Sequence, residues 1–413
     1  MGSKRKLIVT AVALLVLAPA ARSSGFLIYE HGAAAMAMAG AFTSLAKDPS
    51  AIWHNPAGLA WLEGTQIMGG ATLIFPRGTA DFPDYPGSPS YDQVHKVFYP
   101  PNLYLTHKLS DRAVLGLGVF SPYGLGIEWP EPESFPWRYL GTSGDMVTFF
   151  INPAIAFKVT KRFSLGLGVS FIYSKLTQSV TQLMDMGEMS FDVPTDVEAD
   201  GTGFGFNAGL LYKGDKYRIG LNYRSRYSLK YTGTVAVDIP IYETPFEGTG
   251  ETTFRFPDIV TMGLSFDLTS KLIWAVDLHY IFWSSYDSYT FHLEVPDLEL
   301  SEDLYVPTQW KDSYIARTGL EYLATDRLSL RAGLAYDKTP QPAATMDSSL
   351  PDASRVALTA GFGYKFGKVT LDFAYQFENF RRRTSARPDL PGLLQGTFKT
   401  QAHLFGVNLG YKF

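Results

Sequence analysis

The chain of 413 residues contains no cysteine, which excludes disulfides, zinc–cysteine centres and cysteine nucleophiles. Charged residues make up only 18% of it, which is little for a water-exposed surface of this size. After residue 20 no apolar run reaches the roughly 18–20 residues that a membrane-spanning helix needs. The stability of the fold must therefore come from packing and from backbone hydrogen bonds.

Aromatic residues and glycine are abundant instead. Aromatics form 15% of the chain, with 24 tyrosines and 38 glycines, while the mean hydropathy is −0.02. A mean near zero that is built from apolar and polar residues in alternation is typical of a β-barrel in a membrane.

The N-terminus has the features of a secretory signal. Lys4, Arg5 and Lys6 precede an apolar stretch (residues 7–20), and small residues follow it, so we expect residues 1–23 to be a cleaved signal peptide. Cleavage would leave 32 basic against 40 acidic residues and a net charge of −8. This charge argues against nucleic acid as a partner.

From residue 63 to the end, apolar and polar residues alternate with a period of two. In YRIGLNYRSRYSLKY (217–231) the odd positions are mostly aromatic or aliphatic, and the even positions are polar or cationic. A soluble β-sandwich also alternates, but its strands average five or six residues, whereas many segments here exceed ten. We therefore predict an all-β fold, a transmembrane barrel spanning 63–413.

The alternating segments number fourteen, an even number that places the first and the last residue of the barrel on the same side of the membrane. Their expected bounds are 63–82, 100–110, 113–129, 145–160, 163–183, 200–214, 217–239, 250–269, 272–294, 310–325, 328–342, 354–367, 369–384 and 400–413. Tight turns alternate with long loops, the latter expected at 83–99, 130–144, 184–199, 295–309 and 385–399. Short periplasmic turns and long extracellular loops are the usual arrangement.

Residues 24–62 lack this alternation and are rich in Ala and Gly. Because a barrel of this size would otherwise hold water, we expect them to form a helical plug inside the lumen. Asp48 followed by Pro49 fits the start of a helix, and Asn55 before Pro56 must leave the helical conformation. We expect the irregular turn at Asn55, Pro56 and Ala57 to be a segment that can shift.

Several stretches resemble the FadL family of outer-membrane transporters for long-chain fatty acids and other hydrophobic compounds. They are GF (25–26), AGAF (39–42), DPSAIWHNPAGL (48–59), FSPYGLG (120–126), LGLGVSFIYSKL (165–176) and LPDASRVALTAGFGYKF (350–366). The plug motif of that family, Asn-Pro-Ala, corresponds to Asn55, Pro56 and Ala57. The resemblance extends over nearly the whole chain that follows the signal peptide.

The resemblance implies an integral protein of the bacterial outer membrane, with lipid and lipopolysaccharide as neighbours, acting as a monomer without a cofactor. It implies that a hydrophobic ligand lands on extracellular loops, enters a pocket in the barrel and leaves sideways into the membrane at a kink in the third strand. Long-chain fatty acids are the expected substrate, and aromatic or alkane hydrocarbons are the alternative. A general aqueous porin, a surface adhesin and a barrel enzyme are more distant alternatives.

Two regions match these steps. Pro122 cannot donate to a strand ladder and the neighbouring glycines permit a bend, so a lateral gate is expected at Phe120, Pro122, Gly124 and Gly126; an ordinary bulge is the alternative. Two loops rich in aromatics and in adaptable methionines are expected to form the capture groove. Its candidates are Phe135, Trp137, Leu140, Leu183, Met184, Met186, Met189 and Phe191.

Three arginines are predicted by alternation to face the lumen near mid-height: Arg224, Arg226 and Arg317. A fatty-acid carboxylate in an apolar pocket needs such a partner, so these residues are candidates to bind it. Internal ion pairs with inward-facing acids such as Asp277 are the competing interpretation. The seven scattered histidines show no metal-binding spacing, and no nucleophile motif is present, so we expect neither a metal nor catalysis.

Overall fold

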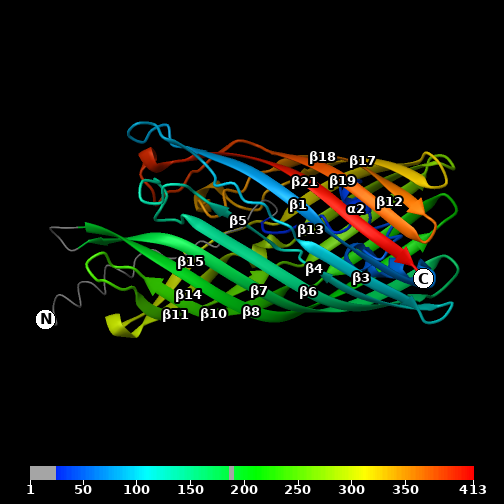
Figure 1. Cartoon of the computed structure of the whole chain (residues 1–413), viewed down its shortest axis with the longest axis horizontal. Coiled ribbons are helices and arrows are strands. Elements are labelled where there is room, and N and C mark those ends of the chain that lie inside the picture. Colours follow the sequence, from blue (N-terminus) through cyan, green and yellow to red (C-terminus); the bar gives the residue numbers. More distant parts are fainter. Residues whose placement is uncertain (1–24, 186–189) are drawn as a thin grey trace.

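Backbone hydrogen bonds join each wall strand to its neighbours, and the ring closes between β1 (Thr65–Asp81) and β21 (Thr397–Lys412). The computed structural model describes residues 25–185 and 190–413. It is a closed antiparallel barrel of fourteen strands, as the sequence predicts (Figure 1). The expected signal peptide lies outside the described residues.

Nine wall strands consist of one segment. They are β1, β3 (Pro101–Lys108), β6 (Ser143–Lys158), β7 (Phe163–Asp185), β8 (Ser190–Lys213), β17 (Leu328–Asp337), β18 (Arg355–Phe366), β19 (Val369–Phe380) and β21. Five wall strands consist of two segments each: β4 (Ala113–Phe120) with β5 (Gly124–Glu128), β9 (Tyr217–Arg224) with β10 (Tyr227–Val237), β11 (Phe246–Phe256) with β12 (Ile259–Asp267), β13 (Leu272–Ile281) with β14 (Ser288–Val295), and β15 (Leu300–Pro307) with β16 (Ser313–Leu323).

The remaining elements are short. β2 (Ser90–Asp92) and β20 (Arg383–Thr384) extend the sheet at one end of the barrel. The helical turns are α2 (Ala33–Met36), α3 (Ala51–His54), η1 (Pro56–Trp61), η2 (Trp283–Ser285), η3 (Pro296–Leu298), η4 (Ala343–Thr345) and η5 (Gly392–Leu394). No helix in the described part of the chain is long and apolar enough to cross a membrane.

The outer surface of the barrel carries a band of exposed apolar side chains. Members from different strands include Leu103, Leu117, Ile151, Leu167, Phe206, Leu278, Leu358 and Val407. Such a band faces lipid in outer-membrane barrels. The end of the barrel with the short turns, on the right in Figure 1, is therefore assigned to the periplasm.

Two of the segments that the sequence predicts to be loops are mainly strands in the structure. Residues 190–199 belong to β8, whose pairing with β7 reaches Asp185↔Ser190, and residues 295–309 are mostly the hairpin of β14 and β15. Acidic residues and Pro194 are typical of loops, but in β8 the acids face outward while Val193 and Val197 are buried on the inner face. Strands in this part of the barrel thus extend well beyond the lipid-facing band.

The inward direction predicted for Arg226 is also wrong, because the strand is interrupted at residues 225–226. Even-numbered residues of β9 face inward and end at buried Arg224, whereas odd-numbered residues of β10 face inward from buried Tyr227 onward. The Arg226 side chain is 71% exposed and pairs with Asp258. The two-residue interruption therefore reverses the alternation on which the prediction rested.

Four neighbouring wall strands are interrupted, at residues 225–226, 257–258, 282–287 and 308–312. Below these interruptions, toward the periplasmic end, β9, β12, β13 and β16 pair in that order. Above them, toward the opposite end, β10, β11, β14 and β15 pair in that order. Pro257, which cannot donate a ladder hydrogen bond, occupies one of them. These four of the fourteen wall strands consequently form an upper and a lower sheet.

Residues 25–62, the N-terminal segment, lie within the ring of strands (Figure 1). Nearly all of them are buried, and α2 and η1 contact the wall from inside. Wall glycines allow this close approach: a Cβ added at Gly220 would lie 2.4 Å from the Thr43 carbonyl oxygen, and one at Gly319 would lie 2.7 Å from the Met38 carbonyl oxygen. The backbone of the segment therefore rests directly on the backbone of the wall.

We predict that Gly220→Val displaces residues 42–45 from the wall without unfolding the barrel, because the added side chain collides with backbone atoms of Thr43 and Ser44. Hydrogen exchange of residues 42–45 should accelerate, while the heat-dependent gel mobility of the folded barrel is retained. Gly410→Val is the matched control, since a Cβ there approaches nothing closer than 3.8 Å. Unchanged exchange in Gly220→Val would contradict the close contact.

Candidate functional site

The Asn55-Pro56-Ala57 turn is fixed to the wall by hydrogen bonds. The Asn55 side-chain amide donates to the carbonyl oxygens of Thr43 and Leu210, both at 2.9 Å, and its oxygen accepts from the Ala57 amide. Asn55 is extended and caps η1, as an N-cap residue does. Added Cβ atoms at Gly166 and Gly209 would lie 2.3 Å from Ala57 N and 2.1 Å from the Asn55 side-chain oxygen. The motif is thus a fixed contact between the segment and strands β7 and β8.

The third wall strand is interrupted where the sequence predicts, between Phe120 and Gly124. Pairing with β6 ends at Phe120↔Phe150 and resumes at Gly124↔Val147, so one extra residue lies on the interrupted side. Pairing of β3 with β4 ends at Asn102↔Phe120. Residues 121–123 form a break in the wall on the side of β3, which we call the strand-3 break.

The beginning of the N-terminal segment covers this break. Ile28 N–H donates to the Pro122 carbonyl at 2.7 Å, Gly124 N–H donates to the Phe26 carbonyl at 3.0 Å, and Leu27 and Tyr123 form an isolated antiparallel bridge between these bonds. Residues 26–28 therefore act as a short extra strand on the exposed edge.

Phe26 itself lies in an aromatic cluster. Its ring centroid is 5.1 Å from that of Trp283, 5.3 Å from that of Phe256 and 5.6 Å from that of Tyr286, in edge-to-face orientations, the arrangement that aromatic pairs prefer. Phe26 is only 1% exposed. The first described residues thus fill an apolar space that borders the strand-3 break.

Two of the predicted lumenal arginines donate to carbonyl groups of the N-terminal segment, and Arg224 also lines a cavity beside Tyr123 and Tyr227. Arg224 donates to the carbonyl oxygens of Ile52 (3.0 Å) and Trp53 (2.9 Å), and its guanidinium lies 4.0 Å from the centroid of the Trp53 ring. Arg317 donates to the Ala39 carbonyl at 2.6 Å and lies 4.2 Å from the centroid of the Tyr29 ring. Each cation thus contacts at least one carbonyl group and also the face of an aromatic ring.

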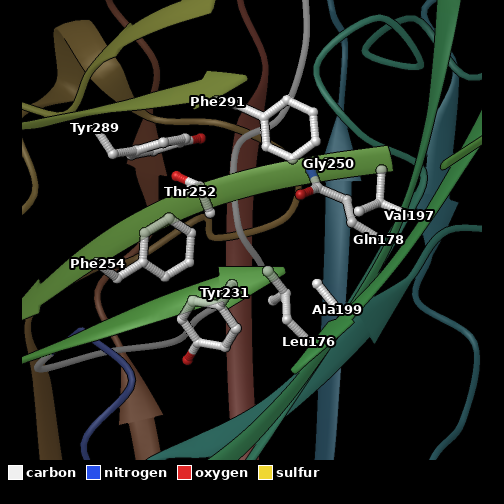
Figure 2. Close-up of a pocket in the computed structure, with 10 residues that line it drawn as sticks. All are labelled: Leu176, Gln178, Val197, Ala199, Tyr231, Gly250, Thr252, Phe254, Tyr289 and Phe291. Atoms are coloured by element: carbon white, nitrogen blue, oxygen red, sulfur yellow. The ribbon is translucent and has the colours of Figure 1, made fainter. Parts of the chain in front are cut away.

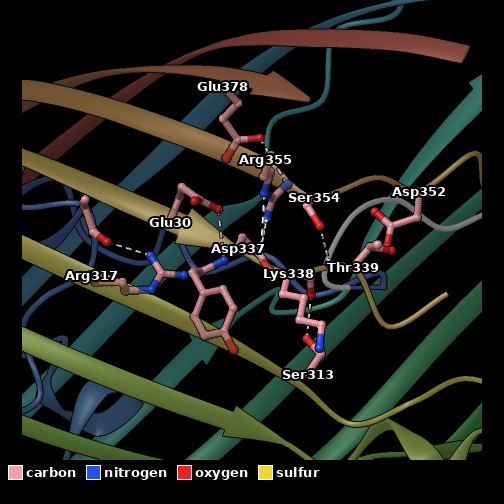
Figure 3. Close-up of polar contacts among 12 residues, drawn as sticks. Glu30, Ser313, Arg317, Asp337, Lys338, Thr339, Asp352, Ser354, Arg355 and Glu378 are labelled. Carbon is pink, nitrogen blue, oxygen red and sulfur yellow. Dashed lines mark hydrogen bonds and ion pairs between the residues drawn. The ribbon is translucent and has the colours of Figure 1, made fainter. Parts of the chain in front are cut away.

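The competing interpretation, internal ion pairs, applies to other arginines. Arg331 pairs with Glu321 and Asp372, and Arg355 pairs with Asp337 and Glu378. Figure 3 shows Arg355 between its two acids, with Arg317 farther along the same wall. Asp277 instead accepts the backbone N–H groups of Phe42 and Thr43. Sequence reasoning missed Arg331 and Arg355 as lumenal groups, although their alternation within β17 and β18 placed them inward.

The predicted capture residues separate into two apolar clusters. Phe135, Trp137 and Leu140 are buried in one cluster, with Phe82, Trp129, Met346 and Phe398. Met184 is buried in another with Val180 and Val193; Phe191 packs against it, and Leu183 is exposed. Arg138 joins the two regions by pairing with Asp192 at 2.7 Å. Met186 and Met189 lie outside the described residues.

A cavity lies on the inner face of the upper wall, where the second of these clusters meets the largest apolar cluster (Figure 2). About 310 Å³ of space lies between its lining atoms, a volume that includes open solvent. Its lining includes no charged residue and consists of Leu176, Gln178, Val197, Ala199, Tyr231, Gly250, Thr252, Phe254, Tyr289 and Phe291. We call it the aromatic cavity. Part of its lining comes from strand residues that the sequence assigned to a loop.

An extracellular loop between β17 and β18 folds into the mouth of the barrel. Residues 346–353 are all buried although they form no helix or strand. Ser348 accepts from the Trp129 indole and donates to the Gly141 carbonyl, and Leu350 joins the largest apolar cluster. Burial raises the pKa of two carboxyl groups of this loop, Asp347 and Asp352, to about 7. The loop therefore covers the lumen opposite the periplasmic end.

Within residues 25–185 and 190–413, no group of three or more histidines and acids could hold a metal ion. The aromatic cavity offers a ligand apolar and aromatic surface, while the buried arginines described above bind carbonyl groups or acids.

Comparisons with known proteins agree with this geometry. A family model described as "Outer membrane protein transport protein (OMPP1/FadL/TodX)" matches residues 14–413. The long-chain fatty acid transport protein of Salmonella typhi is 25% identical, with 98% of this chain and 97% of the relative covered. A Pseudomonas aeruginosa FadL homologue superimposes with a TM-score of 0.81 at 20% identity, covering 94% and 100% of the two chains. The Ralstonia pickettii toluene transporter TbuX superimposes with a TM-score of 0.73 at 20% identity, covering 93% and 99%.

We predict that Arg224→Met loosens α3, because two hydrogen bonds from a charged donor are lost, at a cost of about 3 kcal/mol of local stability. Hydrogen exchange of residues 51–54 should accelerate, and current fluctuations should increase in planar bilayers. Arg226→Met is the control and should change neither, since that side chain is mostly exposed. Equal behaviour of the two variants would refute the assignment of Arg224 to the N-terminal segment.

We predict that the loop at residues 346–353 loosens as pH rises from 5 to 8. The pKa values of Asp347 and Asp352 are higher in the folded loop than in an unfolded chain, so the folded loop binds more protons and loses stability as pH rises through about 7. Arg387 faces Asp347, while Thr339, Arg383, Arg355 and Asp337 face Asp352. Hydrogen exchange corrected for its intrinsic pH dependence would measure the effect, and Asp347→Asn should reduce it; no pH dependence would contradict it.

Proposed function

Because the chain belongs to the OMPP1/FadL/TodX family, whose members transport hydrophobic compounds across the outer membrane, we propose that it takes up hydrophobic molecules and releases them sideways at the strand-3 break. The chain is accordingly an integral protein of the bacterial outer membrane. The observation that carries the proposal is the pairing of residues 26–28 with the edge of that break. When these residues leave, a gap opens in the wall beside lipid.

The path begins in the aromatic cavity. It lies above the lipid-facing band, and its aromatic walls suit an apolar ligand. The ring of Phe26 contacts Phe256, which lies on the wall below this cavity, and Tyr123, which lies in the strand-3 break. Phe26 therefore occupies the space between the two. Displacing Phe26 would let a ligand move from one to the other without crossing water. The residues around Phe135 and Trp137 remain our candidates for the surface that first binds the ligand. Because they are buried in one cluster, that cluster has to open before they can bind it.

We favour uncharged ligands, such as aromatic or alkane hydrocarbons, over long-chain fatty acids. The expectation of a fatty acid rested on arginines free to bind a carboxylate. Arg224 and Arg317 bind carbonyl groups of the N-terminal segment and Arg226 faces outward. Burying a carboxylate without a partner is very unfavourable, and the aromatic cavity has no charged lining residue.

Fatty acids are the second candidate, supported by the name of the Salmonella relative and by its coverage of nearly the whole chain. The toluene transporter whose structure resembles this one supports the first. A general aqueous porin is disfavoured, because the N-terminal segment occupies the lumen. For the same reason we expect the unmodified protein to show no large steady current.

We predict that fixing residue 27 to the strand-3 break stops transport. Leu27 and Tyr123 form an antiparallel pair without hydrogen bonds between them, for which Cα atoms lie about 4.5 Å apart, within disulfide range. Since the chain has no cysteine, the double variant Leu27→Cys/Tyr123→Cys can form one defined disulfide.

Cells that carry this double variant should take up toluene and oleate only after reduction, and each single cysteine variant is the control for the loss of the original side chain. Uptake by the oxidised protein equal to that of the reduced one would exclude release through this break. Comparison of the two substrates in the reduced protein decides between hydrocarbons and fatty acids.

A further inference from the structure

A second cavity lies on the opposite side of the N-terminal segment from the aromatic cavity. It is bounded by four consecutive wall strands, β18, β19, β21 and β1, and by residues Leu27, Ile28 and Glu30 of the segment. It comprises about 400 Å³ of space between atoms, including a part open to solvent. We call it the Arg355 cavity.

The Arg355 cavity has two chemically different sides. Leu27, Ile28, Ile74, Phe380, Ala402 and Leu404 provide the apolar side. Glu30, Arg355 and Glu378 provide the charged side, and each of these three is at most 8% exposed. A cavity with this division suits a molecule that has an apolar body and one polar head group.

The charged side carries more negative than positive groups. Arg355 contacts Glu378 and Asp337, each at 3.0 Å. The Gln376 amide nitrogen donates to Glu30 at 2.9 Å and to Glu378 at 2.7 Å, which holds these two acids close together. The cavity lining thus contains two carboxyl groups, those of Glu30 and Glu378, and one guanidinium. Arg317, the next cation along this wall, donates to Ala39 on the other side of Tyr29.

Resting on the function proposed above, we propose that the Arg355 cavity binds the head group of hydrophobic molecules that carry a hydrogen-bond donor, a protonated amine or a hydroxyl, and that it rejects carboxylates. An ammonium group compensates the excess negative charge, and a hydroxyl can donate to a carboxylate oxygen. A carboxylate there would be a further like charge beside Glu30 and Glu378. These two lining acids thus determine head-group specificity.

The N-terminal segment connects this cavity to the proposed exit. Leu27 and Ile28 line the cavity, and the same residues pair with the strand-3 break. Their departure from the break therefore removes one wall of the cavity. A molecule with its head group among Glu30 and Glu378 has its apolar body against the residues that must move for release.

The test varies the head group on one alkyl chain. Dodecylamine, dodecanol, dodecanoate and dodecane, each radiolabelled, are equilibrated at pH 8 with the protein in lipid nanodiscs, and binding to empty nanodiscs is subtracted. At this pH the amine is protonated and the acid ionised. We expect the amine and the alcohol to bind at least tenfold more tightly than dodecanoate.

Charge-neutral variants identify the residues responsible. Glu30→Gln should reduce the preference for dodecylamine over dodecanoate at least fivefold, with the fold checked by heat-dependent gel mobility. It is preferred to Glu378→Gln, which also removes an ion pair with Arg355. Glu198→Gln is the matched control, because Glu198 is exposed and pairs with Lys175 on the strand next to it.

Equal affinity for the three head groups, or an unchanged preference in Glu30→Gln, would overturn the head-group proposal. Dodecane, which has no head group, reports on the general function. Binding of dodecane without discrimination among the other three refutes the head-group site alone. Absence of binding for all four compounds refutes both the site and the proposed uptake of hydrophobic molecules.

Discussion

A backbone amide or carbonyl group that faces lipid without a hydrogen bond costs several kcal/mol, so a sheet in a membrane must close on itself. This constraint explains both the ring of strands and the position of the chain's beginning. At the strand-3 break the wall loses its β3 partner, and Pro122 has no N–H of its own. The Pro122 carbonyl and the Gly124 N–H are paired instead with Ile28 and Phe26. Sealing the wall and placing the N-terminal segment are therefore one interaction.

The backbone hydrogen bonds of that interaction are few. Two backbone hydrogen bonds contribute roughly 1–3 kcal/mol in total, far less than the pairing of two complete wall strands. The Asn55-Pro56-Ala57 turn, by contrast, is held by side-chain hydrogen bonds and by glycine contacts to β7 and β8. The turn that the sequence suggests as a movable part is thus held by more contacts to the wall backbone than residues 26–28 are. The departure of residues 26–28 would break two backbone hydrogen bonds and the ring contacts of Phe26.

The barrel was predictable from sequence because alternation, turn spacing and lack of long apolar runs all indicate it. The strand-3 break was predictable for a local reason, since proline and glycine have the same effect wherever a strand contains them. The direction of Arg226 was not, because alternation carries over only while a strand is uninterrupted, and residues 225–226 reverse it. The extended hairpins were missed because their outward-facing acids and Pro194 resemble loop residues, although the inner face stays apolar.

The roles of the arginines depend on a partner that no pattern within a strand reveals. Arg224 lies on β9, yet the carbonyl groups that it binds are about 170 positions away in the N-terminal segment. Carbonyl dipoles and aromatic faces stabilise a buried cation without neutralising it, whereas Arg355 pairs with the carboxylates of Asp337 and Glu378. The same residue type thus fastens the segment at one place and pairs with wall acids at another. Both arrangements hold their cations away from the aromatic cavity, whose lining therefore has no charged residue to pair with a carboxylate.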